Sequence, residues 1–462
     1  MFKENLMNIK KLSLLAGLTL LSTQTYAANW LSLQGTEKPG SSARAKLWGF
    51  VQPEYQSTDG GELKAGPFAG QIMSPNVIRP DNTSTETFNI RRARIGVRGT
   101  GFPLDDKVNY FLLAELGHNG ITKNGKTAVA LTDASITLNH IPGARVRVGQ
   151  FKTPTSEEGL QAIHVFNYVN FTNITNQMML ERYTDGDGSE VNGQPEFLAD
   201  GVTPNPKFKT GGTFNGINGS VGAFRDQGIQ VFDTFKVNDW EHSYAVMYGN
   251  GNGINRSDNN DAKDTYLYWS SELIFGGKGA RRQGMKLFAW NQSGTRTLTT
   301  SDANGKGEYD RDRSGLGVTF LKDKYRFGAE YMTADGMIFN GSDAGAIPGS
   351  TNNAGDAKSD INVLTEDKSD GYYVDFGYKV LPKLELDVRY DVLNRATETA
   401  AGERKFDTLT LGAQYFLNKK SRITFNYEIR NQEAPDFAST AAPNQIADSL
   451  DDLLSLQLLV IF

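Results

Sequence analysis

The chain has 462 residues, of which 22% are charged, and beyond its first 27 residues no apolar stretch approaches the length of a membrane-spanning helix. Its net charge of −5 leaves no basic excess for a nucleic-acid partner. Cysteine is absent and the four histidines are scattered without ligand-like spacing, so we expect no metal, no other cofactor and no enzyme active site.

Residues 1–27 predict a secretory signal peptide. Two lysines precede an apolar stretch over residues 12–21, and small and polar residues follow it up to Ala27. The apolar stretch is shorter than the ~20 residues that a spanning helix needs, which favours cleavage after Ala27 over a membrane anchor. An acidic residue interrupts the basic region before the apolar stretch, so translation starts at either Met1 or Met7.

The remaining residues, 28–462, predict one β domain. Its segments alternate apolar and polar residues with period two and are rich in aromatic and β-branched side chains. Most have about the 9–11 residues that a tilted strand needs to cross a bilayer. The sixteen candidate strands are 46–55, 88–98, 107–116, 131–139, 144–152, 229–235, 242–249, 266–275, 285–293, 313–320, 325–334, 372–380, 384–394, 406–416, 422–430 and 452–462.

Short and long connections alternate between these strands. The short ones include 140–143, 321–324, 381–383 and 417–420, and the long ones are 56–87, 117–130, 153–228, 294–312, 335–371 and 431–451. A barrel with short periplasmic turns and longer external loops has this regularity, whereas a soluble sandwich has no reason for it. We therefore predict an all-β, antiparallel transmembrane barrel of about sixteen strands in the outer membrane of a Gram-negative bacterium, in contact with lipid and lipopolysaccharide.

The last strand carries the clearest local pattern. Leu454, Leu456, Leu458, Val460 and Phe462 share one face, and Phe462 ends the chain. This pattern resembles the signal that outer-membrane proteins present to the barrel assembly machinery. The alternative is a buried terminal strand of a soluble domain. In a barrel, pairing of this strand with the first would remove unpaired edges that cannot face lipid.

The second candidate strand, 88–98, places three arginines on one face. Alternation puts Arg92, Arg94 and Arg98 opposite a face of small and aliphatic side chains. A charge on the lipid face costs ~2–4 kcal/mol near the midplane, so we expect all three to face the lumen.

The fifth candidate strand, 144–152, repeats the arrangement. Arg145 and Arg147 alternate with two valines, and a bulge at Gly149 would turn Lys152 inward as well. These basic residues are the candidate pore-lining and anion-binding residues, because an arginine stays charged and offers a planar fork to phosphate or carboxylate. Low-dielectric walls would focus their field although the whole chain is acidic.

A second role for these cations stays open. They could pair with carboxylates of the long connection 153–228, such as Glu157 and Glu158, and only hold it in place. That connection is far longer than an ordinary loop, and its aromatic part, 166–171, would be poorly soluble outside the barrel. We expect it to fold at least partly into the lumen and to form the constriction.

Five segments of the chain resemble, in order, segments of the phosphate-selective porins of the O and P type. The resemblance implies a trimeric, sixteen-stranded porin with an arginine-lined lumen and inward-folded loops. No lysine cluster of this chain matches a binding cluster of that family, so the resemblance supports a porin more than it supports phosphate. The matching segments are 91–96, 147–154, 179–182, 225–228 and 248–255.

We therefore predict passive diffusion of small anionic solutes, with phosphate and polyphosphate among the candidates, through an arginine-lined pore. One alternative is a general porin without phosphate selectivity. The other is a structural or adhesive barrel whose lumen is plugged. Conductance separates the plugged barrel from the two porins.

Overall fold

The computed structural model describes most of the β domain. The predicted signal peptide 1–27 and residues 181–222 of the long connection lie outside the described residues. Within the described part, no helix is both long enough and apolar enough to cross a membrane. The described ranges are 29–33, 44–71, 73, 84–101, 105–119, 121–122, 129–180, 223–258, 260–277, 282–298, 307–341, 352–355 and 361–462.

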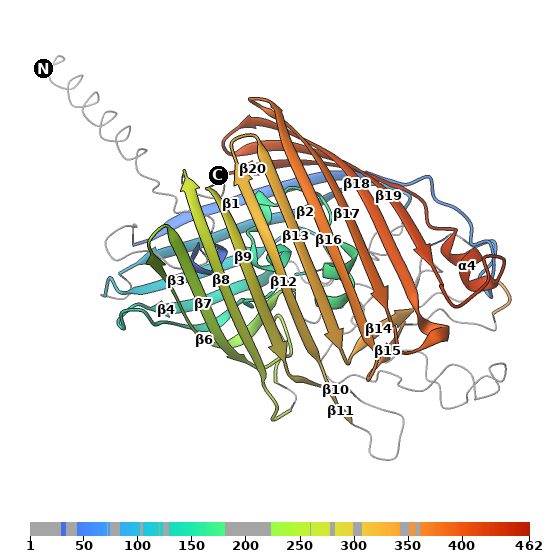
Figure 1. The fold of residues 1–462 in the computed structure, drawn as a ribbon, viewed down its shortest axis with the longest axis horizontal. Helices are drawn as coiled ribbons and strands as arrows, with labels where there is room; N and C mark the ends of the chain where they lie inside the picture. The colour runs from blue at the N-terminus through green and yellow to red at the C-terminus, as the bar shows by residue number, and fades with distance from the viewer. Residues whose placement is uncertain are drawn as a thin grey trace, which may run out of the picture.

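Sixteen antiparallel strands form a closed barrel in which each strand pairs with the next one along the chain (Figure 1). Each predicted strand coincides with one of them, so the predicted sixteen-stranded barrel is confirmed. The strands are β1 (Lys46–Ser57), β2 (Glu86–Thr100), β3 (Val108–Glu115), β4 (Ala130–Leu138), β5 (Arg145–Lys152), β6 (Arg225–Val237), β7 (Trp240–Gly249), β8 (Asp264–Gly276), β9 (Gln283–Ser293), β12 (Asp312–Lys322), β13 (Tyr325–Asp335), β16 (Lys368–Leu381), β17 (Leu384–Arg395), β18 (Arg404–Asn418), β19 (Ser421–Glu433) and β20 (Leu453–Ile461).

Short elements occur outside the wall. Two small hairpins lie within connections for which the sequence predicts no strands, and both lie beyond the same end of the barrel, away from the carboxyl terminus (Figure 1). They are β10 (Thr295–Leu298) with β11 (Gly307–Asp310) and β14 (Ile338–Gly341) with β15 (Ile361–Leu364). The helices are α2 (Trp30–Leu33), α3 (Glu157–Leu160), α4 (Ala442–Ala447), η1 (Ile163–Val165), η2 (Thr175–Met179) and η4 (Ala400–Gly402).

Alternation along each strand separates the lipid-facing surface from the lumen. In β20, Leu456, Leu458 and Val460 are 42%, 37% and 40% exposed, whereas Ser455, Gln457 and Leu459, which alternate with them, are buried. The same strand pairs with β1, which closes the barrel. The predicted outward face and the predicted closure of the last strand are therefore confirmed, and the ladder satisfies the backbone groups that lipid cannot.

A bulge in the first hairpin changes which arginines face inward. The register between β1 and β2 shifts between Gln52 and Pro53, so that Gln52 pairs with Arg92 and Pro53 with Ile90. Pro53 has no N–H to donate, which is why a proline in a sheet is found at such an irregularity. The extra residue, Arg91, is fully buried beside Arg92. Strict alternation along β2 would point Arg91 outward, and the bulge turns it inward.

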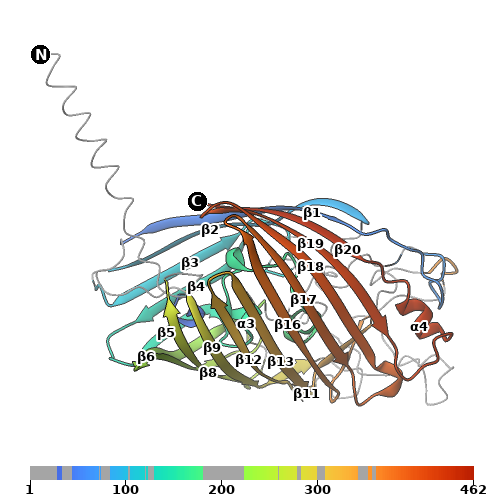
Figure 2. The same ribbon diagram turned by 45° about the horizontal axis from the view of Figure 1, so that its top comes forward.

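The chain after β5 enters the barrel. Residues 153–180, which we call the inserted segment, include α3, η1 and η2, and most of them are buried. Figure 2 shows α3 enclosed by the strands. The inserted segment contacts inward side chains of strands all around the wall, including β2, β9, β12 and β19. The interior is therefore divided by this segment instead of being one wide channel.

Candidate functional site

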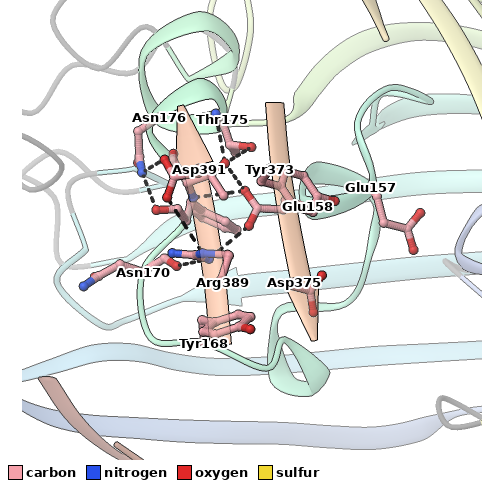
Figure 3. A network of polar contacts seen from close by, with 12 residues as sticks. Glu157, Glu158, Tyr168, Asn170, Thr175, Asn176, Tyr373, Asp375, Arg389 and Asp391 are labelled. Atoms are coloured by element: carbon pink, nitrogen blue, oxygen red, sulfur yellow. Dashed lines mark hydrogen bonds and ion pairs between the residues drawn. The ribbon is translucent and has the colours of Figure 1, made fainter. Parts of the chain in front are cut away.

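One wall of the lumen holds the inserted segment through buried charges (Figure 3). Glu158 of α3 forms an ion pair of 3.3 Å with Arg389 of β17, and both side chains are almost fully buried. Arg389 also donates to the carbonyl oxygen of Asn170 at 3.0 Å. One turn further, the backbone N–H and the side-chain amide of Asn173 donate to Asp391 at 2.8 and 2.9 Å. Charged and neutral contacts thus fix the segment to β17.

The neighbouring carboxylate, Glu157, is held from several sides. Lys286 of β9 lies 2.5 Å from one of its oxygens, and the indole N–H of Trp30 donates to the other at 3.0 Å. The backbone N–H of Glu157 donates to Glu330 of β13 at 3.1 Å. Glu157 and Glu158 therefore pair with Lys286 and Arg389, and not with the arginines of β2 and β5 for which sequence reasoning considered them.

The opposite side of the lumen carries the candidate residues of β2 and β5, which together we call the basic wall. Three of its arginines have carboxylate partners, two of them near the middle of β2 and one, Arg145, at the start of β5. Arg94 lies 2.7 Å from Glu115 of β3, and Arg91 lies 3.3 Å from Glu54 of β1. Arg91 also donates to the side-chain oxygen of Asn170 at 2.7 Å. The basic wall consists of Arg91, Arg92, Arg94, Arg98, Arg145, Arg147 and Lys152.

Arg92 and Arg147 have neutral partners. Arg92 donates to the side-chain oxygen of Gln52 at 3.1 Å, and its guanidinium lies 6.0 Å from the ring centroid of Phe171. Arg147 donates to Thr137 at 3.4 Å and lies 4.5 Å from the ring centroid of Phe232. Among the residues that the structure describes, no carboxylate forms an ion pair with either arginine. A cation over an aromatic face is stabilised without being neutralised.

The remaining predicted residues lie at the ends of their strands. Arg145, one-quarter exposed, is 3.2 Å from Asp233 of β6, and Arg98 lies 5.8 Å from the ring centroid of Phe111. Both are near the periplasmic turns, because β2 ends there and β5 begins there. They could meet a solute only at that end of the lumen.

Lys152 contacts the inserted segment directly. Its ammonium donates to the carbonyl oxygens of Gly159 and Gln161 at 2.8 and 2.6 Å. The last carbonyls of a helix lack partners within it, so a lysine at the end of α3 satisfies them. The register with β4 does not shift at Gly149, but its φ of +124° accompanies a break in alternation, since the next three residues are all buried. This geometry gives Lys152 a supporting position.

The pKa of His164 responds to the positive charges around it. His164 belongs to the inserted segment and not to a strand. Its pKa is lowered to about 4, first by burial and then by the charges of nearby basic residues. These are Lys152, Arg422, Arg94 and Arg98. The imidazole therefore stays neutral in a region where the positive charges of several strands converge.

The facing wall is rich in carboxylates and is called the acidic wall. In the strand order, β13, β16 and β17 are the eleventh to thirteenth of sixteen, so they lie across the barrel from β2 to β5. Arg326 is ion-paired with Asp375, with Glu385 at 3.2 Å and with Asp387 at 2.6 Å. The acidic wall consists of Glu330, Asp375, Glu385, Asp387 and Asp391.

A cavity of about 130 Å³ lies between the inserted segment and the strands β8 to β17. Its lining includes Lys286, Arg326 and Arg389, which sequence reasoning did not single out. The signal was available, because each occupies an inward position in a strand that alternates with apolar outward residues. Among the described residues, no group of histidine and carboxylate side chains has the arrangement of a metal site.

Comparisons with known proteins agree with this architecture. The family model described as phosphate-selective porin O and P matches residues 76–435. No curated protein sequence matches the chain. Among solved structures, the anion-selective porin from Comamonas acidovorans is 14% identical with a TM-score of 0.49, over 91% of this chain and 100% of that one. The channel DcaP of Acinetobacter baumannii is 13% identical with a TM-score of 0.48, over 93% and 100%. OmpF of Salmonella typhi in complex with daunomycin is 12% identical with a TM-score of 0.49, over 90% and 97%.

Proposed function

Because the chain belongs to the family of phosphate-selective porins O and P, we propose that it conducts small anionic solutes across the outer membrane by passive diffusion. The family and the closed barrel make it an outer-membrane porin. The preference for anions is our inference from the lumen, and phosphate is one candidate solute among several oxyanions.

The observation that carries the proposal is the charge of the basic wall. Arg92 and Arg147 keep their charge without a carboxylate partner among the described residues, since their contacts are with an amide, a hydroxyl, a backbone carbonyl and aromatic rings. The paired arginines add less to the potential, because Glu115 and Glu54 offset them. A narrow lumen with low-dielectric walls concentrates the remaining positive field on passing ions.

The spacing of the arginines suits diffusion instead of tight binding. Arg92 and Arg98 are six residues apart on β2, which is about 20 Å along the strand at ~3.3 Å per residue. An anion that leaves one guanidinium therefore meets the next before it re-enters bulk water. Each guanidinium can replace part of the hydration of an oxyanion through its planar fork. A series of weak contacts lowers the entry barrier without trapping the solute.

Ion substitution in planar-bilayer recordings tests this proposal. Replacing chloride by a bulky anion should lower the conductance strongly, because anions carry most of the current. Replacing potassium by a bulky cation should change it little. The opposite result would contradict the proposal. Titration of phosphate against the chloride current then tells a phosphate-preferring pore, in which phosphate blocks, from a general anion pore, in which it does not.

A second candidate function is a structural barrel with a plugged lumen. The observation that favours it is the burial of the basic wall, since Arg92 and Arg147 are only 3% and 1% exposed. A plugged barrel would give no conductance steps at any voltage. Discrete steps with an anion preference would exclude it.

We also infer that the protein assembles with copies of itself, as a homotrimer. The strands β3, β4 and β5 have 8, 9 and 8 residues. Eight residues rise about 26 Å, and a tilt of ~40° leaves about 20 Å of height, less than the ~25 Å apolar band of a barrel in lipid. The outward residues of β4 and β5 are also aliphatic, for example Ile136 and Val148, without aromatic girdle residues. Packing against another copy would shield this short part of the wall, β3 to β5, from lipid.

A further inference from the structure

A short stretch near the amino terminus lies inside the barrel. Residues 29–33 include α2, and Trp30 and Leu31 are only 7% and 2% exposed. Both belong to the buried apolar cluster that also contains Phe232 of β6 and Phe166 of the inserted segment. The predicted cleavage after Ala27 would leave a single residue ahead of this stretch. The function described above assigns it no role.

The stretch is fixed to the barrel wall by polar contacts. The side-chain amide of Asn29 donates to Ser243 at 2.5 Å and to Thr234 at 3.1 Å. The hydroxyl oxygens of Ser32 and Thr234 are 2.9 Å apart. Thr234 and Ser243 face each other on β6 and β7, close to the periplasmic turn between these strands. The contacts therefore place the stretch at the periplasmic end of the lumen.

The same stretch also contacts charged residues inside the lumen. Trp30 donates its indole N–H to Glu157 at 3.0 Å, and this carboxylate is the one paired with Lys286. Trp30 lines the cavity of about 130 Å³ that these two residues also line. On the other side, Arg147 of the basic wall approaches the carbonyl oxygen of Leu31 at 3.5 Å. The stretch thus bridges β5 to β7 and the inserted segment.

We propose that residues 29–32 are a built-in part of the pore constriction, in which Trp30 both narrows the periplasmic side of the lumen and positions Glu157. Trp30 is then a selectivity-determining residue supplied by the amino-terminal end of the chain. The inference rests on the proposed pore function. An isolated carboxylate beside the solute path would oppose anions, and the hydrogen bond from Trp30 together with Lys286 keeps Glu157 engaged.

The position of the stretch is tested by a disulfide that does not depend on conductance. The chain has no cysteine, so Ser32→Cys with Thr234→Cys introduces the only pair. Hydroxyl oxygens 2.9 Å apart put the ends of the two side chains in contact, so small side-chain rotations can bring the Cβ atoms to the ~3.8 Å of a disulfide. Mild oxidation of the folded protein should form the bond nearly completely, as seen by gel mobility and intact mass. Absence of the bond would overturn the proposal, and the single variants control for bonds between molecules.

The role of Trp30 is tested by single-channel recording. Trp30→Ala should raise the conductance and reduce the preference for anions, because it widens the lumen and removes one of the two side chains that hold Glu157. Trp30→Phe keeps most of the volume and loses only the donor, so it should change selectivity and leave conductance close to that of the wild type. Trp269→Ala is the matched control, since Trp269 is 46% exposed on the outer surface. Heat-modifiable gel mobility shows that each variant is folded.

The two proposals fail in different ways. A Trp30→Ala pore with wild-type conductance and selectivity would overturn the role of Trp30. A wild-type protein that gives no conductance would contradict the proposed pore, while formation of the disulfide would still support the location of the stretch. The oxidised and reduced forms of the double-cysteine variant should have the same conductance, because the bond holds the stretch where it already lies. A large change on oxidation would show that the conducting state has the stretch elsewhere.

Discussion

The basic wall and the acidic wall face each other across one lumen, yet they handle charge in different ways. On the acidic wall, Arg326 has three carboxylates around it, and the charges of this wall are largely engaged with one another. On the basic wall, Arg92 and Arg147 have neutral partners. The electrostatic field in the lumen therefore depends on which charged residues are paired, and a count of charged residues would not reveal that field.

The two walls also hold the inserted segment differently. On the side of the acidic wall, the buried ion pair between Arg389 of β17 and Glu158 holds the segment. The basic wall uses neutral acceptors, since Arg91 donates to the amide oxygen of Asn170 and Lys152 donates to backbone carbonyls. Holding the segment through neutral groups leaves the positive charges of the basic wall in place. Holding it through an ion pair removes two charges from the field.

The largest expected effect comes from breaking the anchor on the acidic wall. Arg389→Met leaves Glu158 buried without its cationic partner, which costs about 3–5 kcal/mol of stability for a buried pair. We expect a marked fall in the temperature at which the folded form is lost on gels, together with noisy channel currents as the segment loosens. The double variant with Glu158→Gln should lose much less, because no charge is left alone. Equal losses in the single and double variants would contradict an ion-pair anchor.

The second-largest expected effect comes from a comparison on the basic wall. It compares arginines that have no described carboxylate partner with an arginine that forms an ion pair. Arg92→Gln with Arg147→Gln removes two charges that no described carboxylate pairs with, and should reduce the anion-to-cation permeability ratio several-fold. Arg94→Gln with Glu115→Gln removes an ion pair without changing the net charge, so its permeability ratio should stay near that of the wild type. Reversal potentials in a salt gradient measure both. Similar shifts in the two double variants would show that pairing does not decide the field.

A smaller effect of opposite sign is expected on the acidic wall. Asp375→Asn removes one of the three carboxylates around Arg326 and leaves the guanidinium less fully compensated. The anion preference should rise modestly, because two carboxylate partners remain. The same reversal-potential measurement checks this, with Asp370→Asn on the outer surface as a control. An unchanged anion preference would place the acidic wall outside the electrostatics of the solute path, and a fall would contradict the expected sign.

The smallest effect concerns His164. Its ordinary pKa of 6.5 is lowered to about 4 in the folded protein. The imidazole is therefore protonated below pH ~6.5 in the unfolded chain but only below pH ~4 in the folded chain. The free energy of unfolding falls as the pH drops through this window, because only the unfolded chain binds the proton there. His164→Gln should flatten that part of the pH profile of thermal stability. An unchanged profile would mean that burial and the nearby positive charges do not lower the pKa of His164 in the folded protein.

The barrel could be predicted from the sequence almost in full, because alternation and connection length are local properties. All sixteen strands and the outward face of β20 follow from them. The same rule would also have found Lys286 and Arg326, had it been applied to every strand. The two small hairpins, β10–β11 and β14–β15, lack the length and alternation of spanning strands, so the same signals do not reveal them.

The pairing inside the lumen could not be predicted from the sequence. Arg91 turns inward only because the register shifts at Pro53, and a shift of this kind depends on two strands at once. The partners of Glu157 and Glu158 lie on β9 and β17, more than one hundred residues away, and local patterns say nothing about such a contact. Sequence reasoning could place the arginines on a face, but only the fold decides which of them are neutralised.

The reversal potential of the wild-type pore, recorded across a KCl gradient at low and at high mean salt, tests the central claim most directly. If Arg92 and Arg147, which no described carboxylate pairs with, set the field, the potential should show a clear anion preference near 0.1 M salt. This preference should shrink toward 1 M, as the screening length falls from ~10 Å to ~3 Å. A cation preference at low salt, or a preference that does not change with salt, would contradict it.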